Sequence, residues 1–150
     1  MVILTRRLTS HSGHAAQAVL ALTALARTRS RHRHQLASGE PAYLQLPRGT
    51  CLNDGDLLAS DSGDEIVQVV AKPEPVMTVR ADTPLQLLKA AYHLGNRHVP
   101  LQVTKTWLRL SPDPVLKALL IEQLHLNVTE EVAPFHPEVG AYHTHNRHAH

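Results

Sequence analysis

The sequence predicts an α+β protein: a small N-terminal β-barrel or β-sandwich domain, then a ferredoxin-like domain, then a flexible histidine-containing tail. Three observations support this organisation. Gly, Pro, Asn and Asp punctuate the first half at short intervals, as between short strands. Strand-like and helix-like segments of the second half follow the order β-α-β-β-α-β. The end of the chain has no apolar periodicity. We therefore expect domains at 1–73 and 74–136 and a tail at 137–150.

Composition narrows the class of protein. Of the 150 residues, 43% are hydrophobic and only 3% are aromatic, so the cores must be largely aliphatic. A single cysteine, Cys51, excludes an internal disulfide and a cysteine-rich zinc site. No apolar stretch is long enough to span a bilayer. A formal net charge of +2 is too small to indicate nucleic-acid binding by itself.

The N-terminal residues resemble targeting signals. Residues 5–8 contain adjacent arginines, as a twin-arginine signal does, and 24–26 has the small-residue pattern of a cleavage site. Residues 1–39 contain six arginines and no carboxylate, which could also suit an organelle transit peptide. The alternative is a basic, alanine-rich part of a folded domain.

Turn residues and β-rich segments alternate through the rest of the first half. Residues 38–41 separate two candidate strands, and 53–56 and 61–64 form further turns. Residues 65–70 are rich in Ile and Val and predict a strand. Residues 15–26 are the exception, because their Ala and Leu favour a helix by intrinsic propensity.

Two prolines in the segment 72–75 mark the boundary between the halves, because proline cannot donate a ladder hydrogen bond. Residues 76–80 then predict a strand. A helix follows, capped by Asp82 or Thr83 and ended by Gly95, a residue suited to a left-handed stop. Its expected apolar positions are Leu85, Leu88, Ala91 and Tyr92.

The remaining segments complete the predicted ferredoxin-like domain. Residues 99–103 and 106–110 predict strands, 115–124 predicts a helix after Asp113, and 127–132 predicts a final strand. One face of such a sheet can be buried under both helices. A domain of about 60 residues has a small core, so dimerisation would help to stabilise it.

Histidine is the anomaly of the composition, with 12 among 150 residues and four in the last eight. Imidazole is a ligand suited to zinc, copper and nickel, and two His-x-His pairs on a flexible segment can chelate without a preformed pocket. Cysteine and carboxylate ligands are scarce nearby, which favours a labile metal site. The alternative is a merely solvated tail. The histidines concerned are His143, His145, His148 and His150.

Two further histidines lie near the end of the first predicted helix of the second half. His98 follows that helix, where a single histidine is more often structural than a ligand. His93 lies within the helix, five residues earlier, which differs from the i, i+4 spacing of a helical chelate. Spacing alone therefore assigns neither histidine to a metal.

Arginine and histidine alternate over 29–34. On a strand, Arg29, Arg31 and Arg33 would share one face, and His32 and His34 the other. The arginines could bind phosphate or an acidic partner. The alternative, which we favour from the residues alone, is a solvated basic edge that discourages sheet aggregation.

Common catalytic motifs are absent from the sequence: no phosphate-binding Gly-Lys-Ser/Thr loop, no His-Glu-x-x-His, no Gly-x-Ser-x-Gly and no nucleophile–base set. We therefore expect a binding protein rather than an enzyme. A metal-dependent hydrolase, a basic nucleic-acid-associated module and a general zinc, copper or nickel buffer remain alternatives. The lack of aromatic stacking platforms weighs against nucleic acid.

The run AYHLGNRHVPLQ at 91–102 resembles the UreE family of urease accessory proteins, which are nickel metallochaperones. LPRGT at 46–50 and DGDLL at 54–58 resemble the N-terminal domain of that family. PFHPE at 134–138, with the GAY that begins two residues later, resembles the stretch before its histidine-bearing tail. The resemblance covers roughly 20–150 and crosses the possible cleavage site, so we expect a cytoplasmic protein.

The resemblance implies a homodimer that carries Ni²⁺ for assembly of the urease metallocentre. The histidine matching His98 binds nickel at the subunit interface in that family, and tail histidines add ligands. Zn²⁺ or Cu²⁺ could occupy the same histidines, and we include His93 among the metal-site candidates. The implied partners are the urease apoprotein and its accessory GTPase, with neither a membrane nor nucleic acid.

The N-terminal β domain of the family is thought to bind a partner peptide. The residues that we assign to partner contact on this basis are Arg48, Arg29, Arg31 and Arg33. For 15–30 the family implies a strand and a turn instead of a helix. Residues 111–114 stand where some relatives carry an extra His-x-His, so that additional metal site should be absent.

Overall fold

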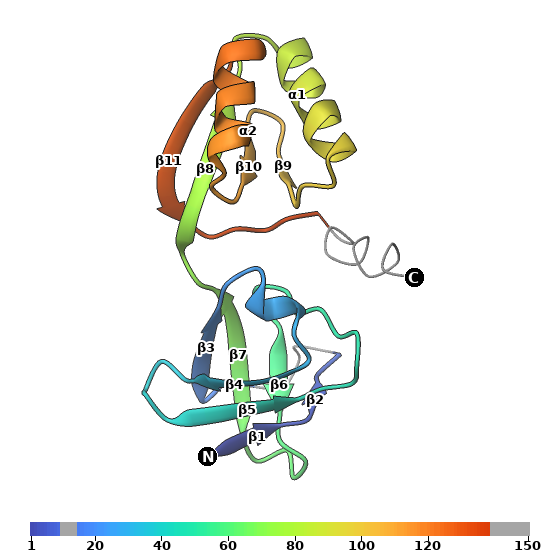
Figure 1. The fold of residues 1–150 in the computed structure, drawn as a ribbon. Coiled ribbons are helices and arrows are strands. Elements are labelled where there is room, and N and C mark those ends of the chain that lie inside the picture. Colours follow the sequence, from blue (N-terminus) through green and yellow to red (C-terminus); the bar gives the residue numbers. More distant parts are fainter. Residues whose placement is uncertain (10–14, 139–150) are drawn as a thin grey trace. The chain divides into compact units, whose positions relative to one another are not determined.

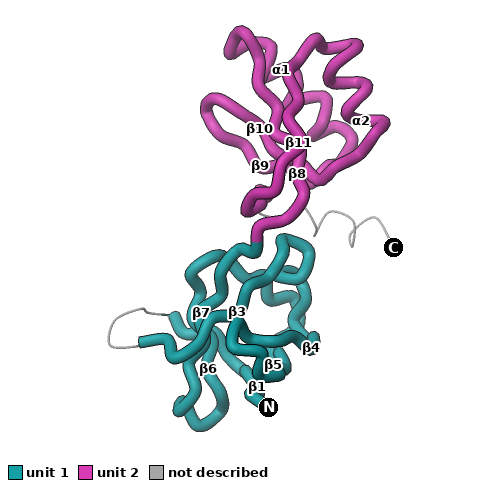
Figure 2. The backbone as a smooth tube through the Cα atoms, turned by 90° about the vertical axis from the view of Figure 1, so that its left-hand side faces the viewer, with its two compact units in different colours: residues 1–72 teal, residues 73–150 magenta. Residues whose placement is uncertain are grey.

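The computed structural model describes residues 1–9 and 15–138 and confirms a mixed α+β protein. The chain divides into two compact units, Met1–Lys72 and Pro73–His150, each with its own hydrophobic core (Figures 1 and 2). Within the described residues, no helix has the length and apolarity needed to cross a lipid bilayer.

Two sheets build the first unit. One has the order β1-β5-β4, in which β1 (Val2–Leu4) runs parallel to β5 (Pro41–Gln45) and β4 (Arg31–Gln35) runs antiparallel to it. The strands β4 and β5 form a hairpin around the turn expected at 38–41, where Gly39 has a φ of +93°. Leu4 and Leu44 of this sheet are fully buried.

The second sheet of this unit has the order β2-β6-β7-β3 and shares one aliphatic core with the first. Its strands are β2 (Arg6–Arg7), β6 (Leu57–Ala59), β7 (Ile66–Ala71) and β3 (Ala18–Leu22). Neither sheet of the described residues closes on itself. The expectation of a β-barrel is therefore wrong, because the strands divide between two separate ladders.

The helix that propensity favours at 15–26 does not form. Ala18–Leu22 instead pairs in parallel with β7 along its whole length, and a short 3-10 helix, η1 (Ala26–Thr28), follows. Leu20 and Leu22 alternate with exposed Ala21, so the strand buries two leucines in the core. This burial outweighs a helix propensity of a few tenths of a kcal/mol per residue.

The residues that resemble a twin-arginine signal are part of the folded unit. Arg6 and Arg7 form β2, which pairs with β6. Just before them, Val2 and Leu4 are 5% and 0% exposed.

The second unit has the element order expected of a ferredoxin-like domain. Its sheet is wholly antiparallel with the order β11-β8-β10-β9. Apolar residues of both helices join strand residues in one core cluster, so the helices cover the same face of the sheet (Figure 1). The elements are β8 (Glu74–Arg80), α1 (Pro84–Asn96), β9 (Gln102–Val103), β10 (Leu108–Leu110), α2 (Pro114–Ala118), the π-helical turn η2 (Leu119–Gln123) and β11 (Asn127–Ala133).

The segment that links the two units is shorter than the two prolines in 72–75 predict. Pro75 pairs with Val132 as the second residue of β8, so it does not belong to a linker. Strand β10 reaches only as far as Met77, so at Pro75 β8 has a neighbour on one side alone. Proline is tolerated there because no second ladder needs its missing N–H.

Helix α1 begins with a capping box. The Thr83 hydroxyl accepts a hydrogen bond from the Gln86 N–H, and the Gln86 side chain accepts one from the Thr83 N–H, at 3.2 Å each. The face of the helix that packs on the sheet is not the predicted one. Leu87, Ala90 and Leu94 are buried. Of the predicted positions only Ala91 packs against the core, whereas Leu85, Leu88 and Tyr92 are 60–67% exposed.

Candidate metal centre

The end of α1 carries the first candidate ligand, His98. The His98 N–H donates to the Gly95 carbonyl at 3.0 Å, and the Val99 N–H donates to the Leu94 carbonyl at 3.3 Å. This pair of bonds is a Schellman motif, and Leu94 and Val99 meet in the same core cluster, as that motif favours. Gly95 lies inside the helix, so its predicted role as the left-handed stop is wrong.

His98 itself takes the left-handed position, with a φ of +56°. Glycine usually occupies this position, because a side chain there costs roughly 1–2 kcal/mol. His98 is also exposed, at the surface of the second unit. Histidine takes this region more often than most residues other than glycine, and His98 does so with its side chain exposed.

A second histidine ends the other helical segment in the same left-handed conformation, with a different pattern of hydrogen bonds. His125 follows η2 with a φ of +54°, and the next residue, Leu126, donates to the Leu120 carbonyl at 2.9 Å. His125 is exposed. Sequence reasoning missed it, because no motif or His-x-His spacing surrounds it.

His93 lies in the last turn of α1 and is half-buried. Its ring meets the Tyr92 ring edge-on at 5.7 Å, and its carbonyl accepts a hydrogen bond from Arg97 at 3.2 Å. Of these two contacts, only the one with Tyr92 involves the His93 ring.

The segment 134–138 is bound against the strand that follows His98. Phe135 is fully buried, the His136 N–H donates to the Gln102 side-chain oxygen at 3.1 Å, and the Glu138 N–H donates to the Leu101 carbonyl at 2.8 Å. The start of the tail is therefore held three residues along the chain from His98. His136 was not among the predicted ligands, although it lies in a stretch that carries the family resemblance.

Arg109 on β10 also binds the segment 134–138. Its guanidinium donates to the hydroxyl of fully buried Thr78 at 3.0 Å and to the Pro134 carbonyl at 3.1 Å. It also lies over the Trp107 ring, 4.2 Å from the centroid, and 4.0 Å from the Glu131 carboxylate. These contacts fix the point from which the C-terminal segment departs.

The four predicted tail ligands, His143, His145, His148 and His150, lie outside the described residues. Within 1–9 and 15–138, no three or more His, Cys, Asp or Glu side chains gather as a metal site. A site with three or more such side chains as ligands therefore needs groups from beyond these ranges or from another chain.

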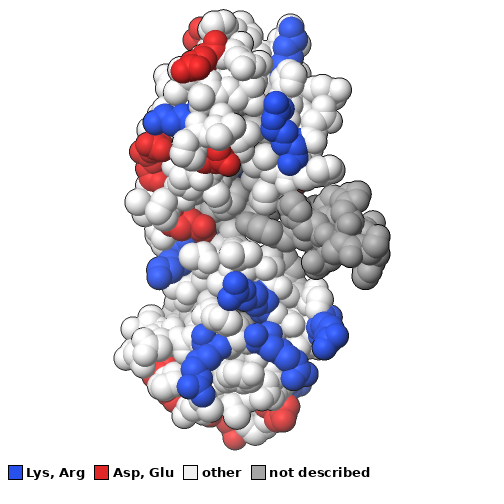
Figure 3. All heavy atoms as spheres, viewed as in Figure 1, with Lys and Arg blue, Asp and Glu red and all other residues white. Residues whose placement is uncertain are grey.

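The basic segment of the first unit lies on β4. Arg31 and Arg33 are exposed on one face, and His32 and His34 are half-buried on the other, as the alternation predicts. Arg29 departs from the prediction. It precedes the strand, and its guanidinium contacts the His32 ring at 3.2 Å instead of joining the other arginines. Figure 3 shows several Lys and Arg side chains on one face of this unit.

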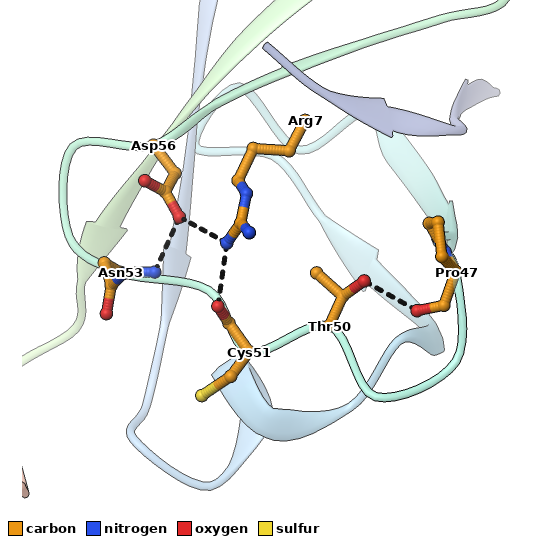
Figure 4. Close-up of polar contacts among 6 residues, drawn as sticks. All are labelled: Arg7, Pro47, Thr50, Cys51, Asn53 and Asp56. Carbon is orange, nitrogen blue, oxygen red and sulfur yellow. Dashed lines mark hydrogen bonds and ion pairs between the residues drawn. The ribbon is translucent and has the colours of Figure 1, made fainter. Parts of the chain in front are cut away.

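A polar network holds the loop between β5 and β6 (Figure 4). The Arg7 guanidinium donates to the Cys51 carbonyl at 2.9 Å and lies 3.4 Å from the Asp56 carboxylate, which also accepts the Asn53 N–H at 2.8 Å. The aspartate thus acts as a turn residue, and the loop is tied to β2.

Arg48 lies on a tight turn of this loop. The Thr50 hydroxyl and N–H both donate to the Pro47 carbonyl, at 2.6 and 3.1 Å, and Gly49 has a φ of +86° (Figure 4). Arg48 is exposed on the turn. It is therefore an exposed cation on a turn held by hydrogen bonds.

Comparison with known proteins gives the same family for both units. The family described as "UreE urease accessory protein, N-terminal domain" matches 3–72, and "UreE urease accessory protein, C-terminal domain" matches 74–150. A urease accessory protein UreE of Nostoc punctiforme is 57% identical over 131 residues, 87% of each chain. Two others, of a Nostoc species and of Thermosynechococcus vestitus, are 49% and 51% identical over 99% and 97% of this chain and 100% of their own.

Proposed function

Because this chain belongs to the UreE family of urease accessory proteins, we propose that it is a cytoplasmic metallochaperone that carries Ni²⁺ for assembly of the urease metallocentre. In this proposal two protomers each contribute His98 to one ion across a two-fold axis. Tail histidines, His143 and His145 first, complete the coordination. The protein binds and transfers the ion and catalyses no reaction on it.

The match of both units to the UreE family is the observation that carries this proposal. His98 lies in the run 91–102 that resembles this family, whereas His125, which has the same backbone conformation, lies outside that run. The imidazole of His98 is exposed at the end of α1 and is therefore accessible to an ion. A neutral imidazole nitrogen is a good ligand for Ni²⁺.

The exposed face of α1 supports dimerisation beside His98. Leu85, Leu88 and Tyr92 recur at i, i+3 and i+7 and form an apolar stripe along the helix, 60–67% exposed. The stripe runs toward the end of the helix where His98 lies. Contiguous exposed apolar residues mark contact surfaces, and a second copy of this stripe is a self-complementary partner.

The anchor at Glu138 supports participation of the tail. A chain spans at most about 3.3–3.6 Å per residue, so Leu101 lies within about 11 Å of His98. His143 and His145 follow Glu138 by five and seven residues, which gives reaches of about 18 and 25 Å. Either tail histidine can therefore reach the ion held by His98.

The basic groups of the first unit are our proposed contacts with the urease apoprotein or its accessory GTPase. Arg31, Arg33 and Arg48 are exposed on ordered backbone, which suits recognition of an acidic surface. Arg29 is exposed too but is engaged with His32. Its contribution to partner binding should be the smallest of the four.

Isothermal titration with Ni²⁺ tests the metal site. We expect His98→Ala to remove the tightest binding event, and replacement of the four tail histidines by alanine to weaken it. His125→Ala is the matched control, because His125 shares the backbone conformation of His98 at a different helix end. Unchanged affinity and stoichiometry in a protein lacking both His98 and the tail histidines would refute the proposal.

Transfer to urease separates a nickel carrier from a general metal buffer. The nickel-loaded protein should activate urease apoprotein in the presence of the accessory GTPase, and the His98→Ala variant should not. Equal activation by both proteins would favour the buffering alternative. Titrations with Zn²⁺ and Cu²⁺ on the same variants give the metal preference.

A further inference from the structure

The first unit carries a pair of histidines that the proposed function does not use. His32 and His34 lie on β4, the edge strand of the sheet β1-β5-β4. Their register partners on β5, Leu44 and Ala42, are fully buried. The two imidazoles therefore share the inner face of the sheet at its open edge, half-buried and within reach of solvent.

Two ring nitrogens of this pair are hydrogen-bonded to each other. His32 Nδ1 and His34 Nε2 are 2.8 Å apart, and the ring centroids are 4.3 Å apart at an interplanar angle of 51°. Metal–imidazole bonds are about 2.0–2.1 Å long, so two nitrogens at right angles on one ion are separated by about 2.9 Å. Tetrahedral ligands are separated by about 3.3 Å. The observed separation is thus close to that of adjacent ligands in tetragonal or octahedral geometry.

We propose that His32 and His34 form a second, bidentate site for a divalent transition ion that accepts tetragonal imidazole coordination, Ni²⁺ or Cu²⁺. The site goes beyond the proposed function, because it lies in the other unit and uses neither His98 nor the tail. Its ligands come from a single strand, so each protomer carries its own copy.

Arg29 opposes metal binding at the ring of His32. Arginine can only donate, so its Nη1 donates to His32 Nε2 at 3.2 Å, and the His32 proton then lies on Nδ1 and points to His34. An ion bound between the two rings requires that proton on Nε2 instead. Arg29 must then turn away, which makes it a competitor of the metal.

The surroundings of His34 are open but cationic. His34 lines an open pocket of about 590 Å³ together with Arg33, Pro41 and Lys72, and His32 does not line it. Since the described ranges contain no cluster of three possible ligands, water would fill the other positions here. A site with two protein ligands exchanges its ion more readily than a closed one.

The test uses the full chain with His98 and the four tail histidines replaced by alanine, which removes the site of the proposed function. Titration with Ni²⁺ should still reveal one binding event per chain, and His34→Ala in that background should abolish it. His125→Ala in the same background is the control and should leave it intact. Retention of the event in the His34→Ala protein would overturn the proposal.

Replacing Arg29 should change the Ni²⁺ affinity in the opposite direction from replacing His34. Arg29→Ala should tighten the remaining Ni²⁺ binding about three- to tenfold, the scale expected when one screened unit charge beside a divalent ion is removed. Unchanged or weaker binding would contradict the proposed geometry.

If the His34→Ala protein does not fold, the site can be tested by a measurement that leaves β4 unaltered. In the background protein, a substoichiometric amount of Cu²⁺ should broaden the NMR ring signals of His32 and His34 before those of His93. Broadening that begins elsewhere would also overturn the proposal.

Discussion

His98 occupies a backbone conformation in which glycine is the usual residue. The free energy that its side chain costs there can be measured. We predict that His98→Gly leaves the free energy of unfolding of the metal-free protein unchanged or raises it by up to about 1 kcal/mol, because relief of the left-handed strain offsets the greater entropy of unfolded glycine. Urea unfolding checks this.

The same variant should lose the tightest Ni²⁺ binding event, so stability and ligand binding should move independently. His98→Val is the matched control. A β-branched residue is poorly tolerated at a φ of +56°, and we expect it to cost at least about 1 kcal/mol. A clear loss of stability in His98→Gly would mean that the side chain has a structural role.

His34 makes the stability of the metal-free protein depend on pH. Its pKa is below 6.5 in the folded protein, first because of burial and then because of His32 and Arg29. The unfolded chain therefore takes up this proton at a higher pH than the folded one. The free energy of unfolding should fall as the pH drops through 6.5 toward the lowered pKa, with no contribution from His34 above that range.

Replacing His34 by leucine should make this pH dependence shallower. Urea unfolding of both proteins between about pH 7.5 and 5, with a chelator present, measures the difference. An identical slope for the two proteins would show that His34 titrates alike in the folded and unfolded chains.

The left-handed position of His98 could not be deduced from the sequence. Gly95 is the better local stop, but the helix continues for one further residue, and after the turn Val99 packs against the core cluster that contains Leu94. The resemblance to the UreE family singled out His98, whereas spacing did not. His125, which shares its conformation, has no such signal in the sequence.

Helix α1 is an element whose existence was predictable but whose orientation was not. The cap at Thr83 and the apolar periodicity both indicate a helix. However, the sequence offers two apolar stripes, one through Leu85 and Leu88 and one through Leu87 and Leu94. Which of them faces the sheet depends on contacts with strands distant in sequence, and the packing selects the second.

The exposed stripe yields a prediction for assembly. Leu88→Glu should make the proposed dimer monomeric and weaken the proposed Ni²⁺ binding at His98, because a charge at a two-fold contact faces its own copy. The unfolding free energy of the monomer should change by less than about 0.5 kcal/mol, since Leu88 is 67% exposed. Light scattering after size exclusion measures the mass.

Val115→Glu is the control for assembly, because Val115 is a 78% exposed apolar residue on α2. It should leave the mass unchanged. A dimeric Leu88→Glu protein, or a monomeric Val115→Glu protein, would move the dimer contact away from α1.

Arg109 allows a test of the segment 134–138. Arg109→Ala removes the hydrogen bonds to buried Thr78 and to the Pro134 carbonyl, and we expect it to cost about 1–3 kcal/mol. Hydrogen exchange at Glu138 should become faster, because its bond to Leu101 depends on this fastening.

Lys117→Ala is the control for Arg109. It removes only an exposed ion pair with Glu130 at 3.3 Å and should cost less than about 0.5 kcal/mol. Exchange at Glu138 that is equally slow in the Arg109→Ala protein would contradict a role for Arg109 in holding the segment.

At the scale of the whole molecule, the units Met1–Lys72 and Pro73–His150 have separate cores. We predict that 73–150 produced alone folds cooperatively and keeps the Ni²⁺ affinity of the full chain, since His98 and the tail belong to it. Thermal unfolding and titration check this. Loss of Ni²⁺ binding by a folded 73–150 fragment would mean that the first unit contributes to the site.

The element order of the second unit was predictable because its contacts follow local turns and capped helices. The strand Ala18–Leu22 was harder to predict. It pairs in parallel with β7, roughly 50 residues later, and no local signal competes with its helix-forming composition. The division of strands between two sheets depends on the same long-range pairing.

In the proposed function, the hydrogen bond from Glu138 to Leu101 would make the C-terminal histidines tethered ligands. Their encounter with an ion at His98 would then be intramolecular and governed by an effective concentration, on the order of millimolar for a short linker, rather than by the amount of protein. Dilution should therefore leave the tail's contribution to capture intact within each protomer. A partner that prised residue 138 from its strand would lower that local concentration and release the cargo without touching any metal ligand.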